Sequence, residues 1–300
     1  MNRSILLLGG MGIIILVLLY IYVSVPSPKK RIVKPKVITA GRPKISTTIY
    51  SIYSLTKLLV GDKVEVVLLL PSGVDTHHFE PGPATIENAQ NSRLILSIGH
   101  GIDPWANKVS QALNIKILPT DQGISLIQYE DKTTDPHYFL SLKNMAIMAT
   151  FITSILQSEF PSDTQFFQLR SNEIQTRLKN LDTEITEQMK KVENKNIATL
   201  HDAWGYLARD YGINIVGSLE PEGRDITPKE LVSLLESIKK YNVKVVFSQP
   251  AYVGATLEKF ARENGLQVVY ISPIESQGSR NDDVIRIFEN NMQTIIKALH

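Results

Sequence analysis

The residues best suited to chemistry in this chain of 300 residues are its histidines, because imidazole is the commonest metal ligand in proteins. Six are present, and five of them lie where we expect loops or strand ends. Ligands of open α/β sheets bind outside the carboxyl ends of the strands, so polar groups at such places are candidates for a binding site. The five are His77, His78, His100, His137 and His201.

Spacing alone leaves two interpretations of these histidines open. Isolated loop histidines are commonly solvated or make ordinary hydrogen bonds, and the chain has no H-E-x-x-H or C-x-x-C motif. It has no cysteine, which excludes disulfides, zinc ribbons, iron–sulfur clusters, a thiol nucleophile and a cysteine-linked lipid. If a metal binds, its ligands must therefore come from distant parts of the chain.

The charge distribution separates the first 36 residues from the rest. The chain has 32 basic and 30 acidic residues, but residues 1–36 hold six basic residues and no acidic one. The remaining body therefore has 26 basic against 30 acidic residues and is mildly acidic. It shows no sustained basic stripe, which argues against nucleic-acid binding.

Residues 5–25 carry no charge, and a helix of that length would cross the roughly 30 Å hydrocarbon layer of a bilayer. The segment ends without an A-x-A-like cleavage site, which favours an uncleaved signal-anchor over a cleaved signal peptide. We therefore expect residues 1–36 to be a signal-anchor helix and a basic linker. The positive-inside rule alone would place the body in the cytoplasm, because the basic residues cluster after the apolar segment.

The body alternates short apolar runs with helix-like stretches in both of its halves, which predicts an α/β fold with parallel sheets covered by helices. Near-continuous apolar runs such as 64–70 are typical of buried parallel strands. The expected strands are 44–49, 64–70, 93–98, 115–118, 196–200, 213–216, 243–248 and 267–271.

Between the halves, residues 163–195 contain no Pro and no Gly, and their apolar residues fall on one helical face. We interpret this as one long rigid helix packed on two lobes; a coiled-coil partner is the alternative. The predicted domains of the body are an N-terminal lobe, 37–160, the bridging helix, 161–195, and a C-terminal lobe, 196–300.

Five motifs resemble those of the metal-binding solute-binding proteins of ABC transporters, the zinc and manganese receptors of bacterial importers. PSGVDTHHFEP at 71–81 is similar to the signature G-x-D-P-H-x-Y-E-P. SIGHGIDPW at 97–105 resembles G-x-x-x-E-x-W, and DPHYFL at 135–140 resembles D-P-H-x-W-L. LHDAWGYL at 200–207 resembles H-x-A-f-x-Y, and IKKYNVKVVF at 238–247 resembles I-K-x-x-x-V-x-x-I-F.

This resemblance covers residues 44–298 and implies two lobes joined by one long helix, with the metal in the cleft between them. It implies His77, His137 and His201 as ligands. The fourth ligand of the family is usually an Asp after the last strand of the second lobe, where this chain has Ser272. Glu275, three residues further on, is the candidate to replace it.

Three histidines resemble the zinc-type branch of the family, and neutral imidazoles suit Zn²⁺ better than the harder Mn²⁺. The family context implies an extracytoplasmic, monomeric receptor that delivers zinc, with Mn²⁺ or Fe²⁺ less favoured, to an ABC permease and is not an enzyme. Two alternatives stay open. A three-histidine site with an open position could support a metal-dependent hydrolase, and loss of a ligand could leave an adhesion or scaffold protein.

Overall fold

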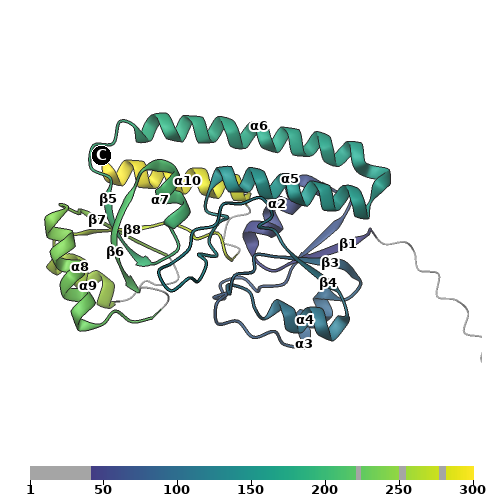
Figure 1. Cartoon of the computed structure of the whole chain (residues 1–300), viewed down its shortest axis with the longest axis horizontal. Helices are drawn as coiled ribbons and strands as arrows, with labels where there is room; N and C mark the ends of the chain where they lie inside the picture. Colours follow the sequence, from purple (N-terminus) through teal and green to yellow (C-terminus); the bar gives the residue numbers. More distant parts are fainter. Residues whose placement is uncertain (1–41, 221–223, 250–254, 277–281) are drawn as a thin grey trace, which may run out of the picture. The chain divides into compact units, whose positions relative to one another are not determined.

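Two parallel β-sheets joined by a long helix make up the part of the chain that the computed structural model describes (Figure 1). That part comprises residues 42–220, 224–249, 255–276 and 282–300. No helix within these ranges is both long enough and apolar enough to cross a membrane. The expected signal-anchor, residues 1–36, lies outside the described residues.

The first sheet has four parallel strands in the order β2-β1-β3-β4. Its strands are β1 (Lys44–Thr47), β2 (Glu65–Leu68), β3 (Ser92–Ser97) and β4 (Lys116–Pro119). The helices that follow them are α2 (Tyr50–Val60), α3 (Pro83–Ala89), α4 (Ala106–Leu113) and α5 (Leu142–Glu159). All four strands lie within about two residues of the apolar runs that predict them.

The second sheet repeats this arrangement with the order β6-β5-β7-β8, again parallel throughout. Its strands are β5 (Asn196–His201), β6 (Asn214–Glu220), β7 (Val245–Ser248) and β8 (Gln267–Tyr270). The helices are α7 (Gly205–Tyr211), α8 (Pro228–Lys240), α9 (Ala255–Glu263) and α10 (Val284–Leu299). The two sheets share a topology although the sequence contains no visible repeat. The predicted α/β class with two parallel-sheet lobes is confirmed.

The bridging helix is α6 (Thr164–Met189), and it packs along α5, α2 and α10 (Figure 1). Its predicted apolar face is buried, from Phe167 to Met189. The helix ends earlier than the expected limit at residue 195, because the N–H of Lys191 bonds to the carbonyl of Gln188, a tighter i to i−3 turn. The chain then turns so that Val192 is buried before β5 begins.

The apolar core has two parts. The larger cluster runs from the first sheet through α5, α6 and α10 to α7 and the neighbouring residues of the second sheet, so it links the two lobes. The smaller cluster joins residues of the second sheet to α8 and α9. The core therefore packs one face of the second sheet against the cluster that continues into the first lobe, and this arrangement lets loops of both lobes meet at one site.

The start of α8 offers a stability test that is independent of any site. Thr227 accepts a hydrogen bond from the Glu230 N–H, and the Glu230 carboxylate accepts one from the Thr227 N–H, so the two residues form a capping box. Thr227→Ala is expected to lower the free energy of unfolding by about 1 kcal/mol in urea denaturation. Ser233→Ala, an exposed position within the same helix, is the control and should change little. Equal losses in both variants would contradict the capping role.

Candidate metal site

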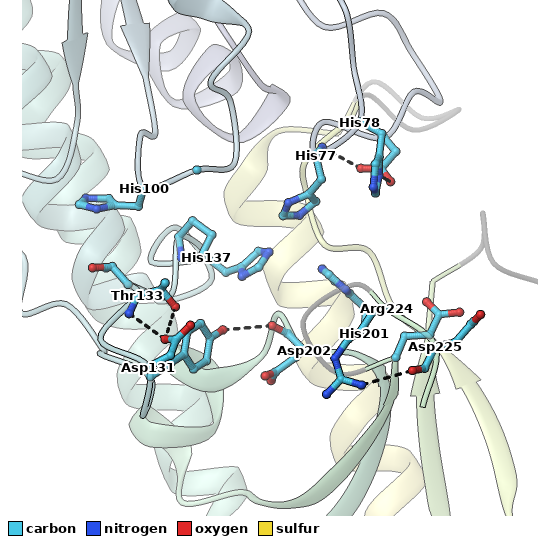
Figure 2. Close-up of a pocket in the computed structure, with 16 residues that line it drawn as sticks. His77, His78, His100, Asp131, Thr133, His137, His201, Asp202, Arg224 and Asp225 are labelled. Atoms are coloured by element: carbon cyan, nitrogen blue, oxygen red, sulfur yellow. Dashed lines mark hydrogen bonds and ion pairs between the residues drawn. The ribbon is translucent and has the colours of Figure 1, made fainter. Parts of the chain in front are cut away.

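Four side chains from four separate segments converge where the loops of the two sheets meet. His77 follows β2, His137 lies between β4 and α5, His201 is the last residue of β5, and Glu275 follows β8. One ring nitrogen or carboxylate oxygen from each of the four lies within 4.8 Å of all the others. Figure 2 shows the three imidazoles pointing toward one another. These separations are compatible with a single ion bound by all four.

The loop that carries His77 is held by its own polar residues. Asp75 accepts a hydrogen bond of 2.8 Å from the His77 backbone N–H, and its other oxygen lies 3.0 Å from Nδ1 of His78. Thr76, which stands where the family signature has Pro, is fully buried and donates to the Ile102 carbonyl at 3.1 Å. The hydroxyl therefore ties this loop to the one after β3.

His137 is almost fully buried, at 3% exposure, and Asp135 fixes its ring. One oxygen of Asp135 lies 2.9 Å from the His137 backbone N and 2.9 Å from ring Nδ1. With Nδ1–H donating to this carboxylate, Nε2 presents its lone pair to the site. Carboxylates that orient a ligating imidazole in this way also raise its basicity.

Glu275 reaches the cluster because the backbone before it takes an unusual turn. Ile274 is buried and has φ of +61°, a left-handed conformation that is strained for a β-branched residue. The Glu275 carbonyl accepts a 2.8 Å hydrogen bond from the N–H of Tyr50, at the start of α2. Ser272 turns its hydroxyl to the N–H of Ile274 at 3.2 Å, and its backbone pairs with Asn291 of α10. The structure thus brings Glu275 into the cluster and engages Ser272 in the turn.

Three of the converging atoms are buried polar atoms without a hydrogen-bond partner among the described residues: His77 Nε2, His137 Nε2 and Glu275 Oε1. The distance from His137 Nε2 to Glu275 Oε1 is 3.7 Å, which is too long for a hydrogen bond. Buried polar atoms are almost always satisfied, since leaving one unpaired costs about 1–3 kcal/mol. Three such atoms facing one another indicate a place for an ion.

The surroundings set the charges of these groups. Burial, with His137 nearby, lowers the pKa of His77 to about 4, and burial together with both other histidines lowers that of His201 to about 3. Both rings are therefore neutral at pH 7. Burial opposes the charged form of His137, but the bond to Asp135 and the nearby carboxylates outweigh it and raise its pKa. Burial raises the pKa of Glu275 to about 7, although His137 opposes this shift.

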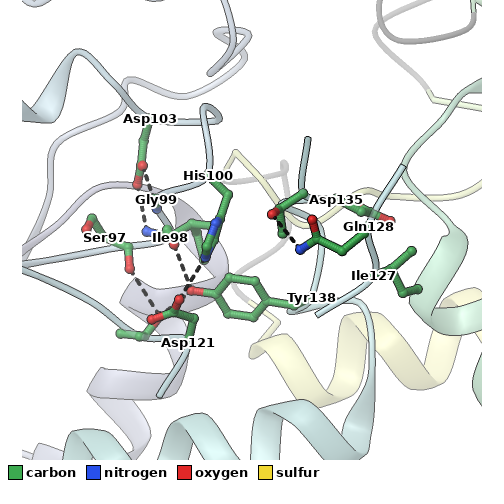
Figure 3. A network of polar contacts seen from close by, with 12 residues as sticks. Ser97, Ile98, Gly99, His100, Asp103, Asp121, Ile127, Gln128, Asp135 and Tyr138 are labelled. Carbon is green, nitrogen blue, oxygen red and sulfur yellow. Dashed lines mark hydrogen bonds and ion pairs between the residues drawn. The ribbon is translucent and has the colours of Figure 1, made fainter. Parts of the chain in front are cut away.

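The remaining loop histidines line the same cavity of about 540 Å³ but are engaged elsewhere. His78 is mostly exposed and faces Asp75. Nε2 of His100 lies 2.7 Å from Asp121, in a polar network around Tyr138 (Figure 3). In this network the buried carboxylate of Asp103 accepts hydrogen bonds from the backbone N–H groups of Ile98 and Gly99. Spacing could not distinguish these histidines from the converging three.

Part of the cavity wall comes from residues that no sequence pattern singles out. They include Tyr129 and Glu220, together with Arg224 and Asp225, which are labelled in Figure 2. The Tyr129 hydroxyl reaches the Asp202 carbonyl at 3.5 Å, which joins the loops of the two lobes. Charged and polar residues therefore surround the outer cavity, whereas the four convergent side chains lie deeper.

The chain belongs to the family of periplasmic zinc-uptake complex component A, ZnuA, whose model matches residues 45–298. It is similar to the zinc-binding protein AdcA of Streptococcus pyogenes serotype M1, with 24% identity over 292 residues, 87% of this chain and 56% of AdcA. The chain therefore spans about half the length of that relative. It is also similar to the high-affinity zinc uptake system protein ZnuA of Bacillus subtilis strain 168, with 26% identity over 278 residues, covering 85% of this chain and 87% of the relative.

A solved crystal structure of ZnuA has the same fold. It superimposes with a TM-score of 0.79 at 25% identity and covers 87% of this chain and all of the other. The resemblance of the motifs to metal-binding solute-binding proteins is thereby confirmed at the level of the family.

Proposed function

We propose that this chain is a receptor that captures one Zn²⁺ ion between its two lobes for delivery to an ABC importer. The observation that carries the proposal is the convergence of three buried donor atoms, from His77, His137 and Glu275, beside the neutral imidazole of His201. None of the three has a hydrogen-bond partner in the part of the chain that the structure describes. Membership of a zinc-uptake family and likeness to proteins named for zinc binding and zinc uptake support it.

The donor set supports zinc as the transported ion. Three imidazoles and one carboxylate match the nitrogen-rich, four-coordinate sites that Zn²⁺ favours, whereas Mn²⁺ prefers oxygen ligands. His77, His137 and His201 supply the nitrogens and Glu275 the single oxygen donor in this proposal. Mn²⁺ and Fe²⁺ are the less favoured cargoes.

The receptor would work outside the cytoplasm, as the periplasmic description of the family indicates. In this proposal residues 1–36 anchor it to the membrane, the body acts as a monomer with lobes 37–160 and 196–300, and the partner is the permease of a metal importer. Protease treatment of intact cells tests the placement, since an exposed body should be digested. A body that is digested only after lysis would refute it.

Competitive metal titration of the purified chain tests the proposed cargo. We expect one Zn²⁺ per chain, bound more tightly than Mn²⁺ or Fe²⁺ in competition with a chromophoric chelator. A chain that binds no transition metal would overturn the proposal and favour the adhesion or scaffold alternative. The hydrolase alternative is not favoured, because with Glu275 as a fourth donor a four-coordinate zinc would have no open position for an activated water.

Zinc binding should depend on pH through Glu275 and His137. Burial raises the pKa of Glu275 to about 7, so the metal-free site holds a proton below that pH, and zinc must displace it. We expect the affinity to fall by at least about tenfold for each pH unit between 7 and 5. His77, whose pKa is lowered to about 4, adds little in this range. Titrations at several pH values measure the slope, and an affinity that is level from pH 7 to 5 would contradict the assignment.

A further inference from the structure

The tyrosine of the motif LHDAWGYL has a place in the structure that the proposed ligand set does not use. Tyr206 is fully buried in α7, the helix that begins four residues after His201. Its hydroxyl accepts a 2.9 Å hydrogen bond from the Ile127 N–H and donates one of 2.9 Å to the Asp135 carbonyl. One side chain of the second lobe thus holds two backbone groups of the first.

The hydroxyl is inserted at the base of a narrow loop. Asp135 N–H bonds directly to the Ile127 carbonyl at 2.9 Å, and Gln128 and Thr134 form an antiparallel bridge beside them. The reciprocal pair, Ile127 N–H and Asp135 C=O, is joined through the Tyr206 hydroxyl. Without that hydroxyl, the Ile127 N–H and the Asp135 carbonyl would each lose a hydrogen-bond partner. To regain one, the base of the loop would have to close until the two groups bonded directly to each other.

One of the two groups held in this way, the Asp135 carbonyl, belongs to the residue that orients His137. The carboxylate of Asp135 contacts ring Nδ1 of His137 at 2.9 Å, and its carbonyl accepts the Tyr206 hydroxyl. The neighbouring Gly205 packs directly on the same carboxylate, since a Cβ atom there would lie 2.8 Å from Asp135 Oδ2. Two adjacent residues of α7, Gly205 and Tyr206, therefore contact Asp135, the residue that orients His137.

The other ligand candidates show why this link matters. His201 and Glu275 both follow strands of the second sheet, but the backbone of Glu275 is also tied to the first lobe by the Tyr50 N–H. His77 lies in a first-lobe loop, so His201 is the ligand candidate that neither of these connections fixes to the first lobe. α7 follows directly after β5, which ends at His201. A hydrogen bond from α7 to the His137 loop therefore couples the two sides of the cluster.

We propose that Tyr206 is a positioning residue that latches the His201 side of the metal site to the Asp135–His137 side through its hydroxyl. The inference rests on the proposed metal site. The latch holds the four donors together while zinc is bound, and its opening separates His201 from the donors fixed to the first lobe. We therefore expect this contact to affect chiefly the rate of zinc dissociation.

The test compares Tyr206→Phe with Tyr211→Phe in the full chain. Both remove one buried hydroxyl from α7, but that of Tyr211 bonds to Asp182 of α6, away from the His137 loop. Zinc release into excess chelator is expected to be about tenfold faster in Tyr206→Phe, with a matching loss of affinity, because supporting contacts of ligands are worth roughly 10–100-fold. Tyr211→Phe should release zinc within twofold of the parent. Bound Co²⁺ should show an altered visible spectrum in Tyr206→Phe alone.

Gly205→Ala provides a second variant that keeps the hydroxyl and favours the helix, yet displaces Asp135. It should also speed zinc release, and it decides the question if Tyr206→Phe fails to fold. Unchanged release and an unchanged Co²⁺ spectrum in a folded Tyr206→Phe variant would overturn the latch, as would equal effects in Tyr211→Phe. If the parent chain itself binds no zinc, the proposed function fails, which is a result separate from failure of the latch.

Discussion

Replacing His137 by alanine is expected to reduce zinc affinity by two to three powers of ten. Zinc sites contribute about 10–16 kcal/mol, so each of four ligands accounts for roughly a quarter. His137 is the most buried of the three imidazoles in the cluster, and its Nε2 has no hydrogen-bond partner among the described residues. Its loss also leaves the Asp135 carboxylate without the ring it orients. Competition with a chelator of known affinity measures the effect.

His100→Ala is the matched control for this prediction. His100 lines the same cavity, but its ring pairs with Asp121 and lies apart from the three converging histidines (Figure 2). Zinc affinity in this variant should stay within about threefold of the parent, because solvent-accessible ion pairs contribute little. Comparable losses in His137→Ala and His100→Ala would refute the proposed ligand set.

The second large effect is expected at Glu275. Glu275→Gln keeps the shape of the side chain but removes the negative charge, so zinc affinity should fall about ten- to a hundredfold as one strong donor becomes a weak one. Mn²⁺, which depends more on carboxylate oxygen, should lose at least as much. The pH dependence between 7 and 5 should also become shallower, because the group whose pKa is raised to about 7 is gone.

Ser272→Ala is the control here, and it separates the two candidates for the fourth donor. The Ser272 hydroxyl accepts a hydrogen bond from the Ile274 N–H. The Asn291 side chain binds both the N–H and the carbonyl of Ser272, and these two bonds do not need the hydroxyl. This variant should bind zinc within about threefold of the parent, because it removes one hydrogen bond worth about 1 kcal/mol. If Ser272→Ala weakens zinc binding more than Glu275→Gln does, the assignment of Glu275 is wrong.

Much of the fold could be predicted because parallel strands are buried on both faces and therefore appear as apolar runs. The positions of the strands and the apolar face of α6 follow from such local patterns, although β6 runs to Glu220, four residues beyond its expected end at 216. The end of α6 at Met189 was harder, since no Pro or Gly marks it and the burial of Val192 continues the apolar pattern past the helix. The limits of the lobes and the nature of residues 1–36 stay predictions.

The sequence by itself determined the α/β class, the resemblance to metal receptors and the ligand candidates, because strand ends and motifs are encoded by neighbouring residues. Only the tertiary structure showed that Glu275 and not Ser272 lies in the cluster of potential ligands. This placement depends on the positive φ of Ile274 and on the hydrogen bond between the Tyr50 N–H and the Glu275 carbonyl. The insertion of the Tyr206 hydroxyl between Ile127 and Asp135 likewise joins residues more than 70 positions apart. Such contacts arise from packing of the two lobes, which no local pattern records.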